Sequence, residues 1–342
     1  MKMRKIAAVG GWLVLALACP RPSHAGKLGN DIIGLFPKDV EEFAYADLKK
    51  ARQLKWFNQL QQQILPSRLR QFEQFLASAG IDPNTQVEEL AWGVVTPAAQ
   101  PQQQDTDGKG AVSASFTGGE QLVGVALGNF NPNSAEEFFK AQKLPTVKSR
   151  GYTMFAFGTG SGPGDLFFFF IDSNTAAFGH RQLLEHLIEV RFGGEESLLR
   201  NDQLFPLINE ANGGGVVWAV LNSAYTHLAI QQLAPEVSQF EGAARLVGRL
   251  QSLILHFDAS SGVDGHFQAV CGSTDDANTL AQLLQAGFLY RRYQERQSNP
   301  ELAELFDQAR VTPSGDRVDL RMSLSDDQMS TLIRRNTFAL KM

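Results

Sequence analysis

The feature that most constrains the fold of this chain is an order of strand and helix patterns that occurs twice along the sequence. Each half begins with a short apolar strand that ends at a good helix N-cap, Asp47 in the first half and Asn222 in the second. Helices, two strands, another helix, further strands and a final helix follow in both halves. Strands connected in this way form antiparallel or mixed sheets backed by helices, because strict βαβ alternation is missing. The sequence therefore predicts an α+β fold of two similar tandem units, residues 26–200 and 201–342.

Apolar periodicity and turn residues place the individual elements. Strands are expected at residues 43–46, 90–95, 122–127, 152–157, 166–171, 175–178, 216–221, 253–257, 266–271, 309–313 and 317–323. Helices are expected over 48–64, up to Gly80, up to Lys140, over 181–190, 223–233, 241–250 and 274–296, from Pro300, and from Ser325. The continuous run Phe167–Phe170 is typical of a strand that is covered on both faces.

Two helix starts resemble each other and support the duplication. Ser134 with Glu137 has the spacing of a capping box, and Ser273 with Asp276 has a similar spacing at the corresponding place in the second half. The stretch Thr96–Gly119, rich in Gln, Pro, Gly and Ser, has no counterpart there. It is therefore interpreted as a mobile loop insertion in the first unit, with partner binding as the alternative.

Residues 1–25 have the three parts of a secretory signal peptide. Lys2, Arg4 and Lys5 precede an apolar run over residues 6–18, and Ser23-His24-Ala25 fits the small-x-small rule of signal peptidase. The run of 13 residues is shorter than the roughly 20 that a membrane-spanning helix needs. The sequence therefore predicts cleavage after Ala25, export, and no transmembrane helix in the mature chain.

A lipoprotein signal is the alternative within the same segment. Leu15-Ala16-Leu17-Ala18-Cys19 resembles a lipobox, in which the cysteine is lipidated and becomes the N-terminus. The match is imperfect because Ala16 occupies the usual leucine position and Pro20 follows the cysteine. Lipidation of Cys19 would tether the protein to a membrane through acyl chains instead of releasing it to the periplasm or the medium.

Charge and cysteine content narrow the class of protein further. The full chain has a net charge of −5, and loss of four basic residues with the signal leaves 27 basic and 36 acidic residues, a net charge of −9. This balance argues against nucleic acid or an anionic membrane surface as a partner. Of the two cysteines, Cys19 leaves or is lipidated, so Cys271 is expected to be a single buried thiol in an apolar strand.

One set of polar residues could bind a metal ion. On the expected hairpin of residues 253–271, alternation places His256, Asp258, Asp264 and His266 on the face opposite to the apolar residues. If the apolar side chains of both strands lie on the same face, the loop between the strands must have an odd number of residues. Asp258 then lies opposite Asp264 or His266. Imidazoles and carboxylates are ligands for Zn²⁺ and other divalent ions. The alternative is the solvent-facing side of an amphipathic hairpin.

Several segments resemble an uncharacterised family of exported bacterial proteins. They are Phe36-Pro37-Lys38-Asp39, Ala46-Asp47-Leu48, Ala177-Phe178-Gly179 and residues 201–207. The resemblance covers most of the mature chain and implies export, and it implies no active-site residue.

These observations lead to two functional hypotheses. The first is a soluble, non-enzymatic envelope or secreted protein without a cofactor, which binds an unknown protein or small-molecule ligand through a sheet surface or acts as a scaffold. The second is an exported metal-dependent hydrolase that uses the cluster of His256, Asp258, Asp264 and His266 with a divalent metal.

Overall fold

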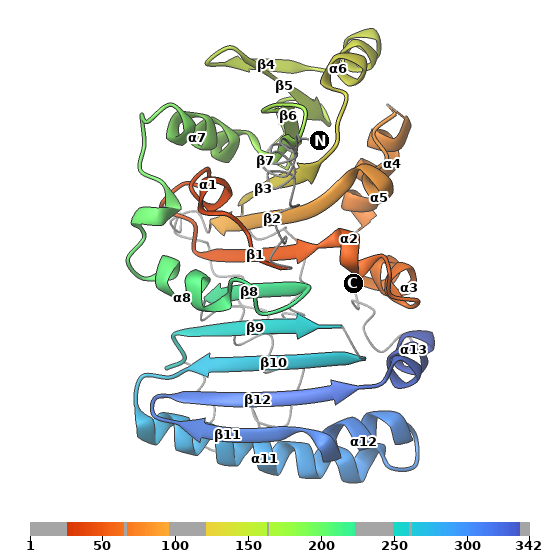
Figure 1. The fold of residues 1–342 in the computed structure, drawn as a ribbon, viewed down its shortest axis with the longest axis vertical. Helices are drawn as coiled ribbons and strands as arrows, with labels where there is room; N and C mark the ends of the chain where they lie inside the picture. The colour runs from red at the N-terminus through yellow and green to blue at the C-terminus, as the bar shows by residue number, and fades with distance from the viewer. Residues whose placement is uncertain are drawn as a thin grey trace, which may run out of the picture.

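Antiparallel strands form one large sheet at the centre of the protein (Figure 1). The computed structural model describes residues 26–64, 67–78, 80–95, 121–162, 164–222, 249–259 and 262–335. In these ranges the sheet has 12 strands in the order β11-β12-β10-β9-β8-β1-β2-β3-β7-β6-β5-β4. Every neighbouring pair is antiparallel. The predicted α+β fold with an antiparallel sheet is therefore confirmed.

Most of the expected strands and helices are present, and the structure adds one strand, β4, and three helices, α1, α5 and α8, that the sequence did not predict. The strands are β1 Glu42–Asp47, β2 Val87–Val95, β3 Gln121–Gly128, β4 Thr146–Ser149, β5 Tyr152–Phe157, β6 Leu166–Phe170, β7 Thr175–His180, β8 Val217–Asn222, β9 Ser252–Asp258, β10 Val263–Val270, β11 Arg310–Ser314 and β12 Arg317–Leu324. The helices are α1 Asn30–Ile33, α2 Leu48–Ala51, α3 Phe57–Ile64, α4 Ser67–Ser78, α5 Pro83–Gln86, α6 Pro132–Ala141, α7 Arg181–Arg191, α8 Leu204–Ala211, α11 Thr274–Glu295, α12 Pro300–Gln308 and α13 Asp326–Arg334, with a 3₁₀ turn at Leu198–Arg200.

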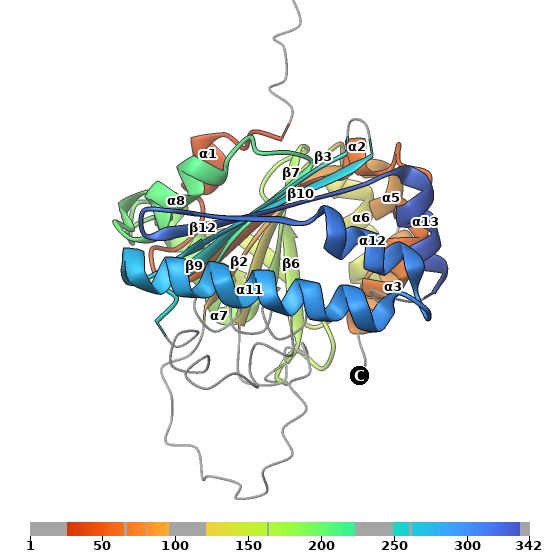
Figure 2. The same cartoon turned by 90° about the horizontal axis from the view of Figure 1, so that it is seen from below.

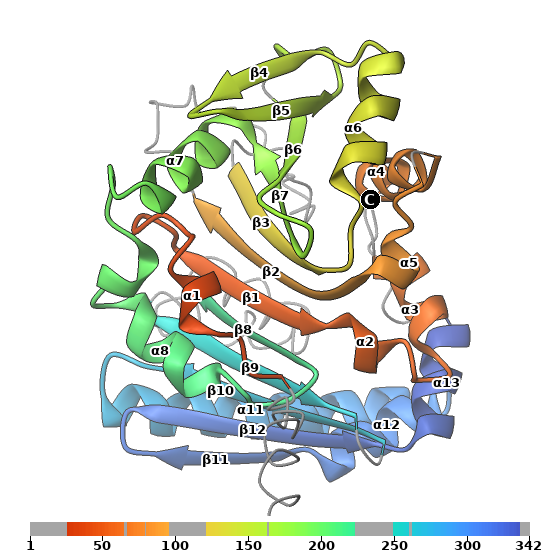
Figure 3. The ribbon, with the colours of Figure 1, turned by 45° about the horizontal axis from the view of Figure 1, so that its top comes forward.

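We call the face of the sheet that carries Tyr45 and Trp218 the first face. Helices α1, α7 and α8 pack on it, and their apolar residues share one core with side chains from β1, β3, β5, β6 and β8. The aromatic rings of Tyr45 and Trp218 stack at its centre with centroids 5.4 Å apart. In Figure 3, α1 and α8 lie over β1 and β8, whereas no helix of the described residues lies over β10 and β12 on this side.

The second face is covered by two other groups of helices. Helices α4 and α6 pack on one half, where Phe139 contacts Phe168 edge to face. Helices α11 and α12 pack on the other half, against Leu253 and Ala269 of the hairpin. Figure 2 shows α8 and α11 on opposite sides of the sheet. Strand β6 is buried along its whole length because both faces are covered, as the run Phe167–Phe170 predicts.

The two predicted units meet in one sheet and share apolar cores. Strands β1 and β8, the first strands of the two halves, pair with each other in the register Phe43↔Val220. Helix α8 lies in the second predicted unit but packs in the core of the first face with residues of the first unit. The tandem origin and the boundary between residues 200 and 201 stay predictions.

Some local expectations were wrong. The helix expected over 48–64 is interrupted after Ala51, and the chain turns so that Trp56 is buried against Met329 and Ile333 of α13. The capping box at Ser134 does not form. Asn131 caps α6 instead, because its side chain accepts a hydrogen bond from the Ser134 N–H and Pro132 fixes the first helical residue. The similarity of this cap to Ser273, which does cap α11, therefore gives no support to the duplication.

Other predicted segments lie outside the described residues. They are the signal peptide with Cys19 and Ala25, the loop over 96–119, the helix over 223–233 and nearly all of the helix over 241–250. Within the described ranges, no helix combines the length and the apolar character that crossing a membrane requires.

Candidate functional site

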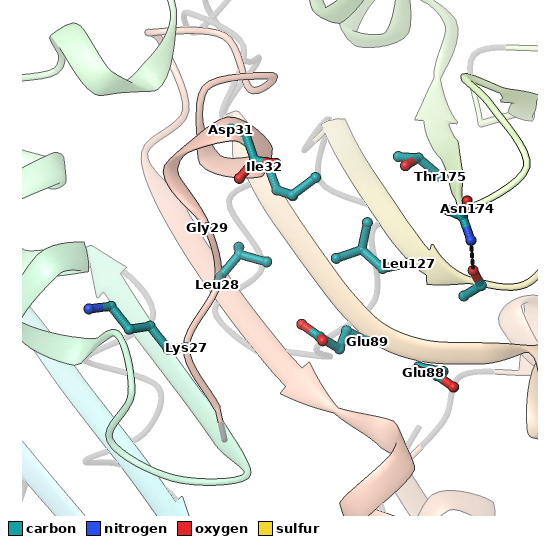
Figure 4. A pocket seen from close by; sticks show the side chains of 11 residues that line it. Lys27, Leu28, Gly29, Asp31, Ile32, Glu88, Glu89, Leu127, Asn174 and Thr175 are labelled. Carbon is teal, nitrogen blue, oxygen red and sulfur yellow. Dashed lines mark hydrogen bonds between the residues drawn. The ribbon is translucent and has the colours of Figure 1, made fainter. Parts of the chain in front are cut away.

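A pocket of about 440 Å³ opens on the first face of the sheet. Its walls are the segment of residues 27–32 and the neighbouring ends of β2, β3 and β7 (Figure 4). The charged side chains around it are Lys27, Asp31, Glu88 and Glu89, and the apolar ones are Leu28, Ile32 and Leu127. A volume of this size is in the range of small-molecule sites, but this site is wide open to solvent and its lining is mainly polar.

The N-terminal wall of the pocket is held by paired hydrogen bonds. The Leu28 N–H donates to the Asn212 side-chain oxygen, and the Asn212 amide donates to the Leu28 carbonyl, both at 2.8 Å. One step earlier, the buried Trp218 indole donates to the Gly26 carbonyl at 2.9 Å. These contacts join the first described residues to the end of α8 and to β8. The wall is therefore held by residues that are more than 180 positions away in the sequence.

The opposite wall depends on close backbone approach. The Asn174 amide donates to the Gly128 carbonyl at 3.1 Å, which ties the turn before β7 to the end of β3 (Figure 4). A Cβ atom at Gly128 would lie 1.9 Å from the Gln86 carbonyl oxygen, so this position accepts only glycine.

Glu89 is a carboxylate of the pocket that a neighbouring strand holds by a hydrogen bond. Residues Tyr45 and Glu89 lie on adjacent strands, and the buried Tyr45 hydroxyl donates to Glu89 Oε2 at 2.9 Å. Burial raises the pKa of Glu89, and the charges of Asp47 and Glu88 raise it further, while the Tyr45 hydrogen bond opposes the shift. Burial also raises the pKa of Tyr45, so the tyrosine stays a donor.

The charges around the pocket leave it negative. Glu88 is paired with Lys49 at 2.9 Å at the rim. Figure 4 shows the Lys27 side chain pointing away from Glu88 and Glu89. Asp31, in the first turn of α1, belongs to the wall that residues 27–32 form. A positively charged group would therefore find two carboxylates, Asp31 and Glu89, that no lysine or arginine of the described residues pairs within 4 Å.

The sequence-predicted cluster does share one face of the hairpin. The register places His266 opposite His256 and Asp264 opposite Asp258, which confirms the first of the two registers that the odd loop allowed. The two imidazole rings have centroids 5.6 Å apart. All four residues lie on the first face, beside Trp218, which pairs with His256 across the sheet.

Contacts with other residues already engage parts of this cluster. His266 Nε2 lies 2.7 Å from Asp319 Oδ1, and the Ser323 hydroxyl donates to Asp264 at 2.5 Å. His256 Nε2 is buried and has no hydrogen-bond partner among the described residues. Burial, followed by the charge of His266, lowers the pKa of His256. No group of three or more His, Cys, Asp or Glu side chains in the described ranges is placed to hold a metal ion. The metal site stays a prediction from sequence.

Cys271 follows β10 and is buried in the core under α11. Burial raises the pKa of its thiol to about 11. It is therefore a poor nucleophile at neutral pH, as expected from the sequence.

The sequence reasoning missed the pocket. The available signals were a tyrosine in an otherwise apolar strand and the adjacent pair Glu88-Glu89 at the start of another. Nothing local indicates that these residues meet, because their contact depends on the register of β1 with β2.

Comparisons with known proteins identify no family. No protein-family model matches the sequence. No curated protein matches it either. Among solved structures, crystal forms I, III and IV of a protein named TP0453 are similar, with 8%, 8% and 9% sequence identity. They cover 89%, 89% and 88% of this chain and 96%, 97% and 95% of theirs, with TM-scores of 0.48, 0.47 and 0.47.

Proposed function

We propose that this chain is an exported, non-enzymatic binding protein of the cell envelope or the extracellular medium, and that it holds a small organic cation in the Glu89 pocket. The observation that carries the proposal is a half-buried carboxylate of raised pKa in a concave site. Groups of this kind are concentrated at functional sites.

The chemistry of the pocket favours an amine over an anion or a neutral ligand. An ammonium group placed between Glu89 and Asp31 would stabilise the ionised Glu89 carboxylate, which burial and neighbouring acids otherwise disfavour, and would pair with Asp31 as well. Leu28, Ile32 and Leu127 would contact the carbon skeleton of the ligand. The site therefore fits a short aliphatic chain that ends in an amino group.

Export is supported by the three-part signal and by the packing of the residue that follows the proposed cleavage point. Gly26 already belongs to the folded protein, because its carbonyl accepts the hydrogen bond of Trp218. The tethered alternative requires lipidation of Cys19. The hydrolase alternative requires a divalent metal at His256, Asp258, Asp264 and His266.

Isothermal titration calorimetry of the mature chain with putrescine tests the proposal, with butanediol as a neutral ligand of the same carbon skeleton. We expect putrescine to bind and butanediol not to bind. Glu89→Gln keeps an acceptor for the Tyr45 hydroxyl but removes the charge, and it is expected to weaken putrescine binding about tenfold or more.

Glu73→Gln is the matched control. Glu73 is also a half-buried carboxylate of raised pKa that accepts one side-chain hydrogen bond, here from Gln61, but it lies outside the pocket. Its variant should bind putrescine like the parent chain. Equal weakening by both variants, or equal affinity for putrescine and butanediol, would contradict the proposed site.

A further inference from the structure

The sheet has two outer strands, β4 and β11, and their free edges differ. Each outer strand is joined to its neighbour by a two-residue turn, Arg150-Gly151 for β4 and Gly315-Asp316 for β11. In such a hairpin the residues that flank the turn form a hydrogen-bonded pair, and bonding then alternates along the strand. The backbone groups that point away from the sheet therefore belong to Thr146 and Lys148 on β4 and to Val311 and Pro313 on β11.

The β11 edge is closed to further strands. Pro313 has no N–H to donate, and the Val311 carbonyl accepts a hydrogen bond from the Gln285 side chain of α11 at 3.0 Å. Proline and side-chain caps of this kind prevent the addition of another chain at a sheet edge.

The β4 edge is open. Thr146 and Lys148 are both exposed. Among the described residues, no group outside β5 is hydrogen-bonded to the backbone of either residue. Figures 1 and 3 show β4 as the outermost strand, with no described element beyond it. The N–H and carbonyl groups of Thr146 and Lys148 are therefore spaced so that a further antiparallel or parallel strand could pair with them.

The surroundings of this edge are basic, although the protein as a whole is acidic. Residues 138–164 include Lys140, Lys143, Lys148 and Arg150 and no acidic residue. Glu136 and Glu189 pair with Lys140 and Arg150. Lys143 and Lys148 have no carboxylate within 4 Å among the described residues. Lys148 points to the same side of the sheet as Phe155, which is the side that α6 covers.

An apolar contact surface lies on the other side of the same edge. Phe192, at the end of α7, is 54% exposed, and the Arg150 guanidinium lies 5.9 Å from its ring centroid. Tyr152 contacts Phe192 and accepts a hydrogen bond from Arg191. Exposed aromatic and arginine side chains are the residues that contribute most to protein interfaces.

We infer that β4 binds an extended, acid-rich segment of a partner protein, which adds to the sheet as a further strand. The backbone of Thr146 and Lys148 would supply the main-chain hydrogen bonds. Alternate acidic side chains of the segment would face Lys143 and Lys148, and the intervening apolar ones would face Phe192. A second copy of this chain is disfavoured as the occupant, because two β4 edges would bring like charges together. The inference is independent of the Glu89 pocket.

Fluorescence anisotropy with a labelled octapeptide of alternating glutamate and valine tests the inference on the mature chain. We expect this probe to bind more weakly as the salt concentration rises, and a lysine–valine octapeptide to bind about tenfold or more weakly. Lys148→Pro reproduces the closed edge of β11 without removing a bond to β5, and it should abolish binding. Lys140→Gln is the matched charge control and should leave the affinity unchanged, because Lys140 is already paired.

Hydrogen exchange of the parent chain keeps the test decisive even if Lys148→Pro is poorly folded. The bound probe should slow exchange of the Thr146 and Lys148 amides and leave the Val147 amide, which already bonds to β5, unchanged. Equal binding of the two peptides, no binding at millimolar concentration, or protection elsewhere would overturn the inference.

Discussion

The Trp56 indole donates a hydrogen bond of 3.0 Å to the Asp326 carboxylate, which joins two residues that are 270 positions apart. Trp56 lies just before α3 in the first predicted unit, and Asp326 is the first residue of α13 in the second. The Trp56 ring is buried with Val263, Met329 and Ile333 in a core to which both predicted units contribute. The helices at this corner therefore stabilise each other across the predicted boundary.

Trp56→Phe should destabilise the whole protein rather than one half. The substitution removes a hydrogen bond to a charged group and part of a buried ring, so we expect a loss of about 2 kcal/mol in the free energy of unfolding. Urea unfolding followed by circular dichroism and by fluorescence should give one coincident transition. Trp92→Phe, at a half-buried position of β2, should cost less. Two separate transitions, with one of them unaffected by Trp56→Phe, would show that the units fold independently.

Glu89→Gln should stabilise the protein at neutral pH, because the ionised Glu89 carboxylate is disfavoured in the folded state. Its pKa is raised in the fold, so its contribution to stability is present while the group is protonated and is lost as the pH rises through the folded pKa. We expect equal stability near pH 4 and a gain of about 0.5 kcal/mol for the variant at pH 7. Because Glu89 is half-buried, solvent screening keeps this gain in stability below the roughly 1.4 kcal/mol that a shift of one full pKa unit would give.

Glu189→Gln provides a control of opposite sign. The Arg150 hydrogen bond lowers the pKa of Glu189, so the contribution of that carboxylate is present above the ordinary glutamate range and is lost on acidification. Its variant should therefore lose stability at neutral pH relative to the parent. Thermal unfolding across the pH range measures both effects, and a change of the same sign in both variants would contradict the assignment.

Metal analysis separates the binding protein from the hydrolase hypothesis. Without a metal, His266→Ala should cost about 1 kcal/mol, because it removes the closer of two hydrogen-bond partners of Asp319, and added zinc should leave the melting temperature unchanged. Stoichiometric zinc or manganese in the purified mature chain, lost in both His256→Ala and His266→Ala, would instead support the hydrolase.

The sequence was sufficient to predict those strands whose conformation depends on the local pattern of apolar and polar residues. The run Phe167–Phe170 predicts a strand buried on both faces. The alternation in residues 253–271 limits the hairpin to two registers, because a one-residue shift would move apolar side chains into water, and the structure has the one that pairs Asp258 with Asp264. Strand β4 was missed because Thr146–Ser149 is short and exposed, and it carries no apolar period. Its strand conformation depends on pairing with β5 across the Arg150-Gly151 turn.

The candidate pocket could not be predicted because its residues meet only through tertiary contacts. Glu89 meets Tyr45 because of the register of β1 with β2. The segment of residues 27–32 is held in place by a hydrogen bond between Leu28 and Asn212, which are 184 positions apart in the sequence. The sequence patterns around Glu89 indicate only a strand with polar residues at its start. Burial and the neighbouring charges, which set its pKa, are properties of the assembled sheet.

The contact between Gly26 and Trp218 gives the last prediction, which concerns the N-terminus. A Cβ atom at Gly26 would lie 2.0 Å from the Gly215 carbonyl oxygen. Gly26→Ala should therefore lower the free energy of unfolding of the mature chain by about 1 kcal/mol, because the added methyl group clashes with that carbonyl. Gly272→Ala, whose Cβ would have no contact closer than 3.5 Å, should cost less.

Intact-mass measurement of the protein after expression in a bacterial host tests the predicted cleavage site. We expect a chain that begins at Gly26, because cleavage after Ala25 leaves the residue that Trp218 holds as the first of the mature protein. A chain that begins at Cys19 with the added mass of acyl groups would replace the released protein with a membrane-tethered one. The seven residues from Cys19 to Ala25 would then form the spacer between the membrane and the fold, and the contact of Gly26 would set where that spacer ends.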